Sequence, residues 1–179
     1  MNLQKPRQSG FSLVELLTVV AVIGILALVT VPNFISFYQM NKVKAAMRNF
    51  TSDLRTARQL AITSGMQAKI TFTPDTSATA ASRAYTFWTG NSAFSATPTW
   101  TQKGRTKYLE DVVYFPKTGQ TFNSSGGVYS IVFFPDGSVG MPSGTPAPTT
   151  ASVVLKTDQK VSKPLYTIDI SPSGRVYAH

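Results

Sequence analysis

An apolar run near the N-terminus most constrains what this chain can fold into. It covers residues 11–31 and contains one charged residue, Glu15. As a helix rising ~1.5 Å per residue, the run would be roughly 32 Å long, which is enough to cross the hydrocarbon core of a bilayer. The charged residues before it are Lys5 and Arg7. Because positive charge beside a span stays in the cytoplasm, we expect the N-terminus inside and the bulk of the chain outside.

The composition argues against several classes of functional site. Of the 179 residues, 42% are hydrophobic and 14% charged, which suits one globular domain in addition to the apolar run. The chain has no cysteine for a disulfide or thiolate site, and its one histidine is His179. Its carboxylates are scattered, and the adjacent Glu110 and Asp111 would point to opposite faces of a strand. We therefore expect a protein that is not an enzyme and that uses no metal or cofactor.

The junction before the apolar run reads GFSLVE, from Gly10 to Glu15. No cleavage site of the A-x-A kind is evident after the run, so an ordinary secretory signal is not indicated. The junction resembles the prepilin signal of type IV pilins and type II secretion pseudopilins. This resemblance implies that residues 1–10 form a leader, that a prepilin peptidase cuts between Gly10 and Phe11, and that the new amino group of Phe11 is methylated.

Glu15 has two interpretations. A carboxylate well inside the hydrocarbon costs at least ~2.5 to 3.5 kcal/mol on insertion scales, so intramembrane carboxylates usually have a function. In the first interpretation Glu15, a turn from the helix start, reaches the water interface and costs little. In the second, implied by the resemblance, Glu15 docks on the free amino terminus of a neighbouring subunit as the span enters a growing filament.

Pro32 follows the apolar run and predicts a kink over residues 28–32, because proline removes a backbone hydrogen bond and clashes with the preceding turn. A helix end at the membrane surface is the alternative. Helical periodicity resumes afterwards, with one apolar stripe of Met40, Val43, Met47, Phe50, Leu54, Ala57 and Ala61 and with Lys44, Arg48 and Arg55 off it. We expect one helix, transmembrane and polymerising over residues 11–38, amphipathic over 39–65, and capped at Gly65.

From residue 66 onward the pattern is that of strands. Runs rich in β-branched and aromatic residues cover 67–73, 84–89, 106–115, 128–134, 152–157 and 165–170. Two pieces, FPDGSV at 134–139 and SPSGRV at 171–176, have the proline and glycine of tight turns. The predicted fold class is α+β, with the long N-terminal helix packed on an antiparallel C-terminal β domain at residues 66–179.

Three segments narrow the resemblance to the GspH/FimT branch, the minor pseudopilins and minor pilins. They are the helix segment containing Phe50, Leu54, Ala57, Arg58, Ala61 and Ile62, the FPDG turn, and the closing residues 170–176. The resemblance implies a pilin-like fold with a β-sandwich-like pair of sheets. It also implies a minor subunit that initiates or caps a type IV pilus or a type II secretion pseudopilus.

The resemblance also implies location and partners. The subunit would cross the bacterial inner membrane once, with its N-terminus cytoplasmic, and would enter a periplasmic or extracellular filament. Its partners would be other pilin or pseudopilin subunits, the prepilin peptidase and the inner-membrane assembly platform. A major pilin is an alternative, although major pilins often carry a C-terminal disulfide loop that a chain without cysteine lacks.

Binding of DNA is a second alternative. Lys103, Arg105 and Lys107 alternate, so on a strand they share one face, and Arg175 lies in the closing turn. Some FimT-like proteins capture DNA with a C-terminal Gly-Arg-x-Arg, where this chain has Gly-Arg-Val-Tyr. The other interpretation of the triplet is a charged edge strand protected from aggregation. The Ser-, Thr-, Ala- and Pro-rich segments 73–83 and 141–151 are expected to be exposed loops.

Overall fold

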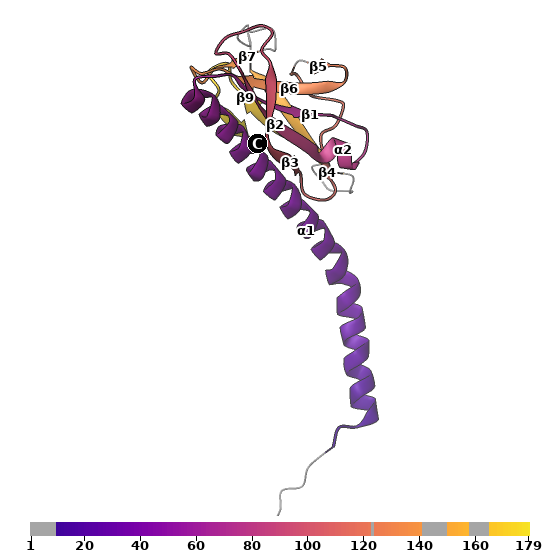
Figure 1. Cartoon of the computed structure of the whole chain (residues 1–179). Helices are drawn as coiled ribbons and strands as arrows, with labels where there is room; N and C mark the ends of the chain where they lie inside the picture. Colours follow the sequence, from indigo (N-terminus) through magenta and orange to yellow (C-terminus); the bar gives the residue numbers. More distant parts are fainter. Residues whose placement is uncertain (1–9, 123, 141–149, 158–164) are drawn as a thin grey trace, which may run out of the picture. The chain divides into compact units, whose positions relative to one another are not determined.

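The computed structural model describes residues 10–122, 124–140, 150–157 and 165–179. The side chains of residues 29 and 31–33 also lie outside the described set. The chain divides into two compact units, Met1–Tyr38 and Gln39–His179. Helix α1, Leu13–Ser64, contributes to both units and is drawn from indigo to purple in Figure 1.

Helix α1 is continuous from Leu13 to Ser64, as the helical periodicity predicts. The helix includes position 32, but the Pro32 side chain lies outside the described residues and the kink stays a prediction. The helix ends before Gly65, whose φ of 65° is the left-handed conformation expected of a glycine cap. The buried stripe consists of Val43, Ala46, Phe50, Leu54, Ala57 and Ala61. Met40 and Met47 are only partly buried, whereas Ala46, absent from the predicted stripe, is 1% exposed.

Two antiparallel sheets form the rest of the second unit (Figure 1). The larger sheet has the order β3-β2-β1-β6-β5, with β7 also paired to β6. Its strands are β1 (Ala68–Phe72), β2 (Ala84–Gly90), β3 (Trp100–Tyr108), β5 (Ser124–Ser125), β6 (Val128–Phe133) and β7 (Val139–Gly140). The smaller sheet has the order β10-β9-β8-β4, formed by β4 (Val113–Tyr114), β8 (Ala151–Thr157), β9 (Leu165–Ile170) and β10 (Val176–Ala178). The predicted α+β architecture is confirmed.

Aromatic side chains join the helix to both sheets. Phe50 of α1 lies edge-on to Tyr85 of β2, with ring centroids 5.0 Å apart, and to Phe115 beyond β4, at 5.2 Å. The ring centroids of Phe72 on β1 and of Phe115 are 4.3 Å apart. Such pairs add about 0.5 to 1.5 kcal/mol each beyond the burial of their area. Phe50 is therefore a main anchor of the β domain on the helix.

The two predicted turns are confirmed, and they are linked to each other. Gly137 and Gly174 have φ values of 82° and 76°, and the Val139 N–H donates to the Pro172 carbonyl at 2.9 Å. Arg58 of α1 binds both turns, since its Nε donates to the Gly137 carbonyl at 2.9 Å and its Nη2 to the Ser173 carbonyl at 3.1 Å. One guanidinium thus ties the end of each sheet to the helix.

The single strand predicted over 106–115 is wrong. Strand β3 begins at Trp100 and ends at Tyr108, and β4 is limited to Val113–Tyr114. The chain passes here from the larger sheet to the smaller one, through Val112 with a φ of 66°. Glu110 and Asp111 accordingly lie in the connection, not on opposite faces of a strand, and Asp111 pairs with Arg83. The sequence pattern did not indicate the break between β3 and β4, because β-branched residues lie on both sides of it.

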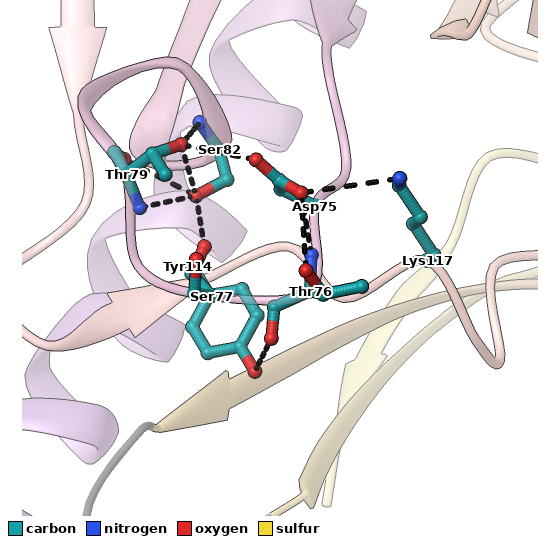
Figure 2. Close-up of polar contacts among 7 residues, drawn as sticks. All are labelled: Asp75, Thr76, Ser77, Thr79, Ser82, Tyr114 and Lys117. Atoms are coloured by element: carbon teal, nitrogen blue, oxygen red, sulfur yellow. Dashed lines mark hydrogen bonds and ion pairs between the residues drawn. The ribbon is translucent and has the colours of Figure 1, made fainter.

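The exposed loop predicted over 73–83 is observed only in part, since residues 73–79 are irregular and mostly exposed. This segment contains a short helix, α2 (Ala80–Arg83), which Thr79 caps and whose Ser82 is completely buried. Figure 2 shows the Asp75 carboxylate beside it, accepting from the Thr76 N–H at 2.7 Å and 3.9 Å from the Lys117 ammonium. The Thr76 N–H, more than the nearby Lys117 charge, holds the pKa of Asp75 below its usual value. Of the other predicted loop, residues 141–149 lie outside the described residues.

Candidate assembly surface

The predicted processing junction lies at the start of α1. Gly10, Phe11 and Ser12 precede the helix, and the Ser12 carbonyl accepts the first helical hydrogen bond, from the Leu16 N–H at 3.2 Å. Phe11 is 82% exposed, and nothing lies within 4 Å of the position of a Cβ on Gly10. The peptide bond between Gly10 and Phe11 is therefore sterically accessible. Cleavage there and methylation of Phe11 stay predictions.

Glu15 lies in the first turn of α1 and is exposed. Among the described residues, no side chain forms an ion pair with its carboxylate. A negative charge in the first turn is favoured by the helix dipole, which stabilises the helix start by about 0.3 to 1 kcal/mol. The carboxylate is thus favoured by the helix dipole and exposed to a cation from outside. Its docking role stays a prediction.

The first unit exposes apolar side chains along its whole described helix. Every valine, leucine and isoleucine of residues 13–28 is more than half exposed, and Leu13 and Leu28 each reach 78%. Phe34, Ile35 and Phe37 continue the series. A helix that is apolar all round needs an apolar environment or other helices around it. This part of α1 is therefore a surface that the isolated subunit leaves uncovered.

Among the residues that the structure describes, no helix combines the length and the apolar character needed to cross a membrane. The predicted span includes residue 29 and residues 31–33, whose side chains lie outside that set. The transmembrane assignment of residues 11–38 stays a prediction.

The predicted basic residues lie on different sheets. Lys103 and Lys107 are on β3, opposite Phe87 and Tyr85 of β2, and an irregular register between these pairs contains Arg105. β3 is the outer strand of its sheet, as the edge-strand interpretation expected. Arg175 is exposed in the turn before β10 of the other sheet. The structure therefore groups the triplet on one edge and leaves Arg175 apart from it.

Lys107 has an internal partner that the sequence analysis missed. Its ammonium lies 2.7 Å from a carboxylate oxygen of Asp53 on α1, whose second oxygen accepts from the Tyr85 hydroxyl at 2.6 Å. Burial, then this hydrogen bond and the Asp53 charge, raise the pKa of Tyr85 far above its usual value. Asp53 is the one acidic residue of positions 39–65, amid five basic residues. That isolation was the signal for an internal ion pair.

Two family models match this chain. The prokaryotic N-terminal methylation motif matches residues 5–31, and the model of the type II transport protein GspH matches residues 46–174, more than half of the chain. The chain belongs to the GspH family. This membership places it among the type IV pilins and type II secretion pseudopilins, in the GspH-like branch, as the sequence predicts. The family and the fold are those of structural filament subunits.

Curated relatives match the N-terminal part of this GspH-family chain. It is 52% identical over 44 residues to the type IV major pilin protein PilA of Myxococcus xanthus, covering 25% of this chain and 20% of PilA. It is 44% identical over 52 residues to the type II secretion system core protein G of Aeromonas hydrophila, covering 29% and 34%. The matches thus span less than half the length of these relatives.

One solved structure has the same fold. It is the type IV minor pilin FimU of Pseudomonas aeruginosa, with a TM-score of 0.51 and 16% identity over 80% of this chain and 92% of FimU. The similarity confirms the predicted pilin-like fold.

Proposed function

We propose that this protein is a minor subunit of a type IV pilus or a type II secretion pseudopilus and that it initiates or caps the filament. The observation that carries the proposal is the uncovered apolar helix of residues 13–28, joined to a GspH-family β domain. Packing that helix among the helices of other subunits would remove its apolar side chains from water, at about 25 cal/mol per Å². The work of the protein is mechanical, and its β domain faces neighbouring subunits.

Entry into the filament begins with processing. The prepilin peptidase cuts between Gly10 and Phe11, on the cytoplasmic side of the inner membrane, and Phe11 is then methylated. The accessible junction and the methylation motif matched at residues 5–31 support this step. Before assembly the subunit crosses the inner membrane once, with its N-terminus cytoplasmic, and the assembly platform then draws it into the filament.

Glu15 sets the docking register. The amino group of Phe11 on one subunit binds the Glu15 carboxylate of the next, which offsets the cost of a charge in an apolar environment. The exposed position of Glu15 in the first helical turn supports this pairing.

Intact-mass and N-terminal analysis of the protein from its native membrane tests the proposal. With the peptidase present, we expect a chain that starts at methylated Phe11. Glu15→Ala should be processed normally and fail to enter filaments, whereas Thr18→Ala, one turn away on the same exposed helix, should enter them. A chain that retains Met1–Gly10 beside an active peptidase would overturn the assignment, and normal filament entry of Glu15→Ala would remove the docking role.

A further inference from the structure

A polar groove runs between helix α1 and the edge strand β3 in the second unit. Its volume is about 430 Å³, and Asn49 and Ser52 of α1 form one wall while Thr106 and Tyr108 of β3 form the other. Asp53, Tyr85 and Lys107 also line it. The walls therefore present amide and hydroxyl groups, which donate hydrogen bonds to anions.

Exposed cations border the groove on its helix side. On the helix, Arg48 and Arg55 lie four residues before and three residues after Ser52, so all three side chains share one face. Among the described residues, neither of these arginines has an ion-pair partner.

The acidic residue of the groove is already engaged. Asp53 binds Lys107 at 2.7 Å and Tyr85 at 2.6 Å, and its side chain is 14% exposed. It therefore neutralises Lys107 and leaves Arg48 and Arg55 without compensation. An acidic partner would supply the opposite charge that these two arginines lack.

We propose that this groove, the α1/β3 seam, binds an acidic segment of a different subunit in the same filament. The proposal rests on the proposed function, because α1 continues from the apolar helix that packs among other subunits. Helix α1 of a second copy is a poor occupant, since its one carboxylate beyond residue 38 is the paired Asp53. A groove of this volume accommodates a few side chains. Single-stranded nucleic acid would need exposed aromatic rings on which its bases stack, and of the described residues that line the groove only Tyr108 offers one.

Binding of a labelled deca-glutamate peptide to the full chain in neutral detergent tests the seam. We expect binding that weakens steeply with salt, and no binding of deca-glutamine. Arg48→Glu and Arg55→Glu should each weaken binding about fivefold, the upper range for one exposed charge pair. Arg175→Glu is the matched control, because Arg175 is also exposed but lies in the turn before β10 of the other sheet. It makes the same change of net charge and should leave affinity within about twofold.

Three results would overturn the proposal. They are no binding of deca-glutamate at low salt, an equal loss in the Arg175→Glu control, and tighter binding of single-stranded DNA of the same charge with the same dependence on Arg48. Mass analysis of the N-terminus in the same variants separates the two proposals. Normal processing without peptide binding refutes the seam alone, whereas an uncut leader refutes the proposed function.

A photocrosslinker at Ser52 identifies the occupant in cells. With Ser52→benzoylphenylalanine in the full chain, we expect crosslinks to an acidic peptide of another filament subunit, and we expect Arg48→Glu to reduce their yield. Crosslinks confined to a second copy, to lipid or to nucleic acid would contradict the proposal.

Discussion

Replacing Gly174 with alanine tests the junction of the two turns. Gly174 has a φ of 76°, and a Cβ at this position would overlap the Gly137 carbonyl oxygen and lie 2.7 Å from Arg58 Nε. The added methyl group cannot be accommodated by a rotamer change, because one obstacle is backbone and the other is a hydrogen-bonded guanidinium. The turns must therefore separate, and Arg58 must release at least one of them.

The expected loss has two parts. An alanine in the left-handed region costs about 1 to 2 kcal/mol, and a lost hydrogen bond from a charged donor costs about 1.5 to 3 kcal/mol. Gly174→Ala should therefore lower the free energy of unfolding by about 3 to 5 kcal/mol. Gly126→Ala is the matched control, because Gly126 has a φ of 59° and nothing lies within 4 Å of its Cβ position. It carries the conformational cost alone.

Thermal unfolding of the full chain, followed by the fluorescence of Trp88 and Trp100, measures the difference. For a protein of this size 1 kcal/mol corresponds to about 2 to 4 °C, so Gly174→Ala should melt about 10 °C below the wild type and Gly126→Ala about 4 °C below it. Both tryptophans lie on strands of the larger sheet and report on the β domain. Equal melting temperatures for the two variants would refute the close approach of the turns.

Two further predictions concern the core and the acid stability. Phe50→Leu should lower the free energy of unfolding by about 1 to 2 kcal/mol, because the edge contacts with Tyr85 and Phe115 are lost while most of the volume is kept; an unchanged urea midpoint would contradict this. The hydroxyl and N–H of Ser138, which donate to Asp136 at 2.6 and 2.8 Å, hold the pKa of Asp136 below its usual value. Its carboxylate therefore adds stability above the unfolded-state pKa of about 3.9, and this is lost as the pH falls through the lower folded-state pKa. The melting-temperature difference between wild type and Asp136→Asn should be largest near pH 7 and shrink below about pH 4; a constant difference would count against this role.

Local patterns predicted most of the regular structure. The stripe of Val43, Phe50 and Leu54 recurs at helical spacing, so the buried face of α1 followed from residues a few positions apart. The same holds for the turns at Gly137 and Gly174. The buried Ser82 was missed because it lies in a short capped helix and donates to the Ser77 carbonyl inside a Ser- and Thr-rich segment, where composition alone indicates a loop.

Some candidate site residues likewise followed from local sequence patterns, whereas the partners of others depended on tertiary contacts. Gly10, Phe11 and Glu15 were found from their order in one short segment, and their accessible positions at the start of α1 agree with that reading without testing it. Lys107 was grouped with Lys103 by alternation along a strand. Its engagement by Asp53 depends on how α1 packs beside β3, which no local pattern contains.

The sequence by itself determined the helix, the strand-rich second half and the family, and it predicted the processing junction, because each pattern consists of residues close together in the chain. Only the tertiary structure decided which distant groups meet. Arg58 reaches carbonyl groups of two turns far along the chain, and Asp53 neutralises Lys107 while Arg48 and Arg55 stay free. These pairings depend on the order of strands in two sheets and on their contact with one helix. They are set by long-range packing and not by local propensity.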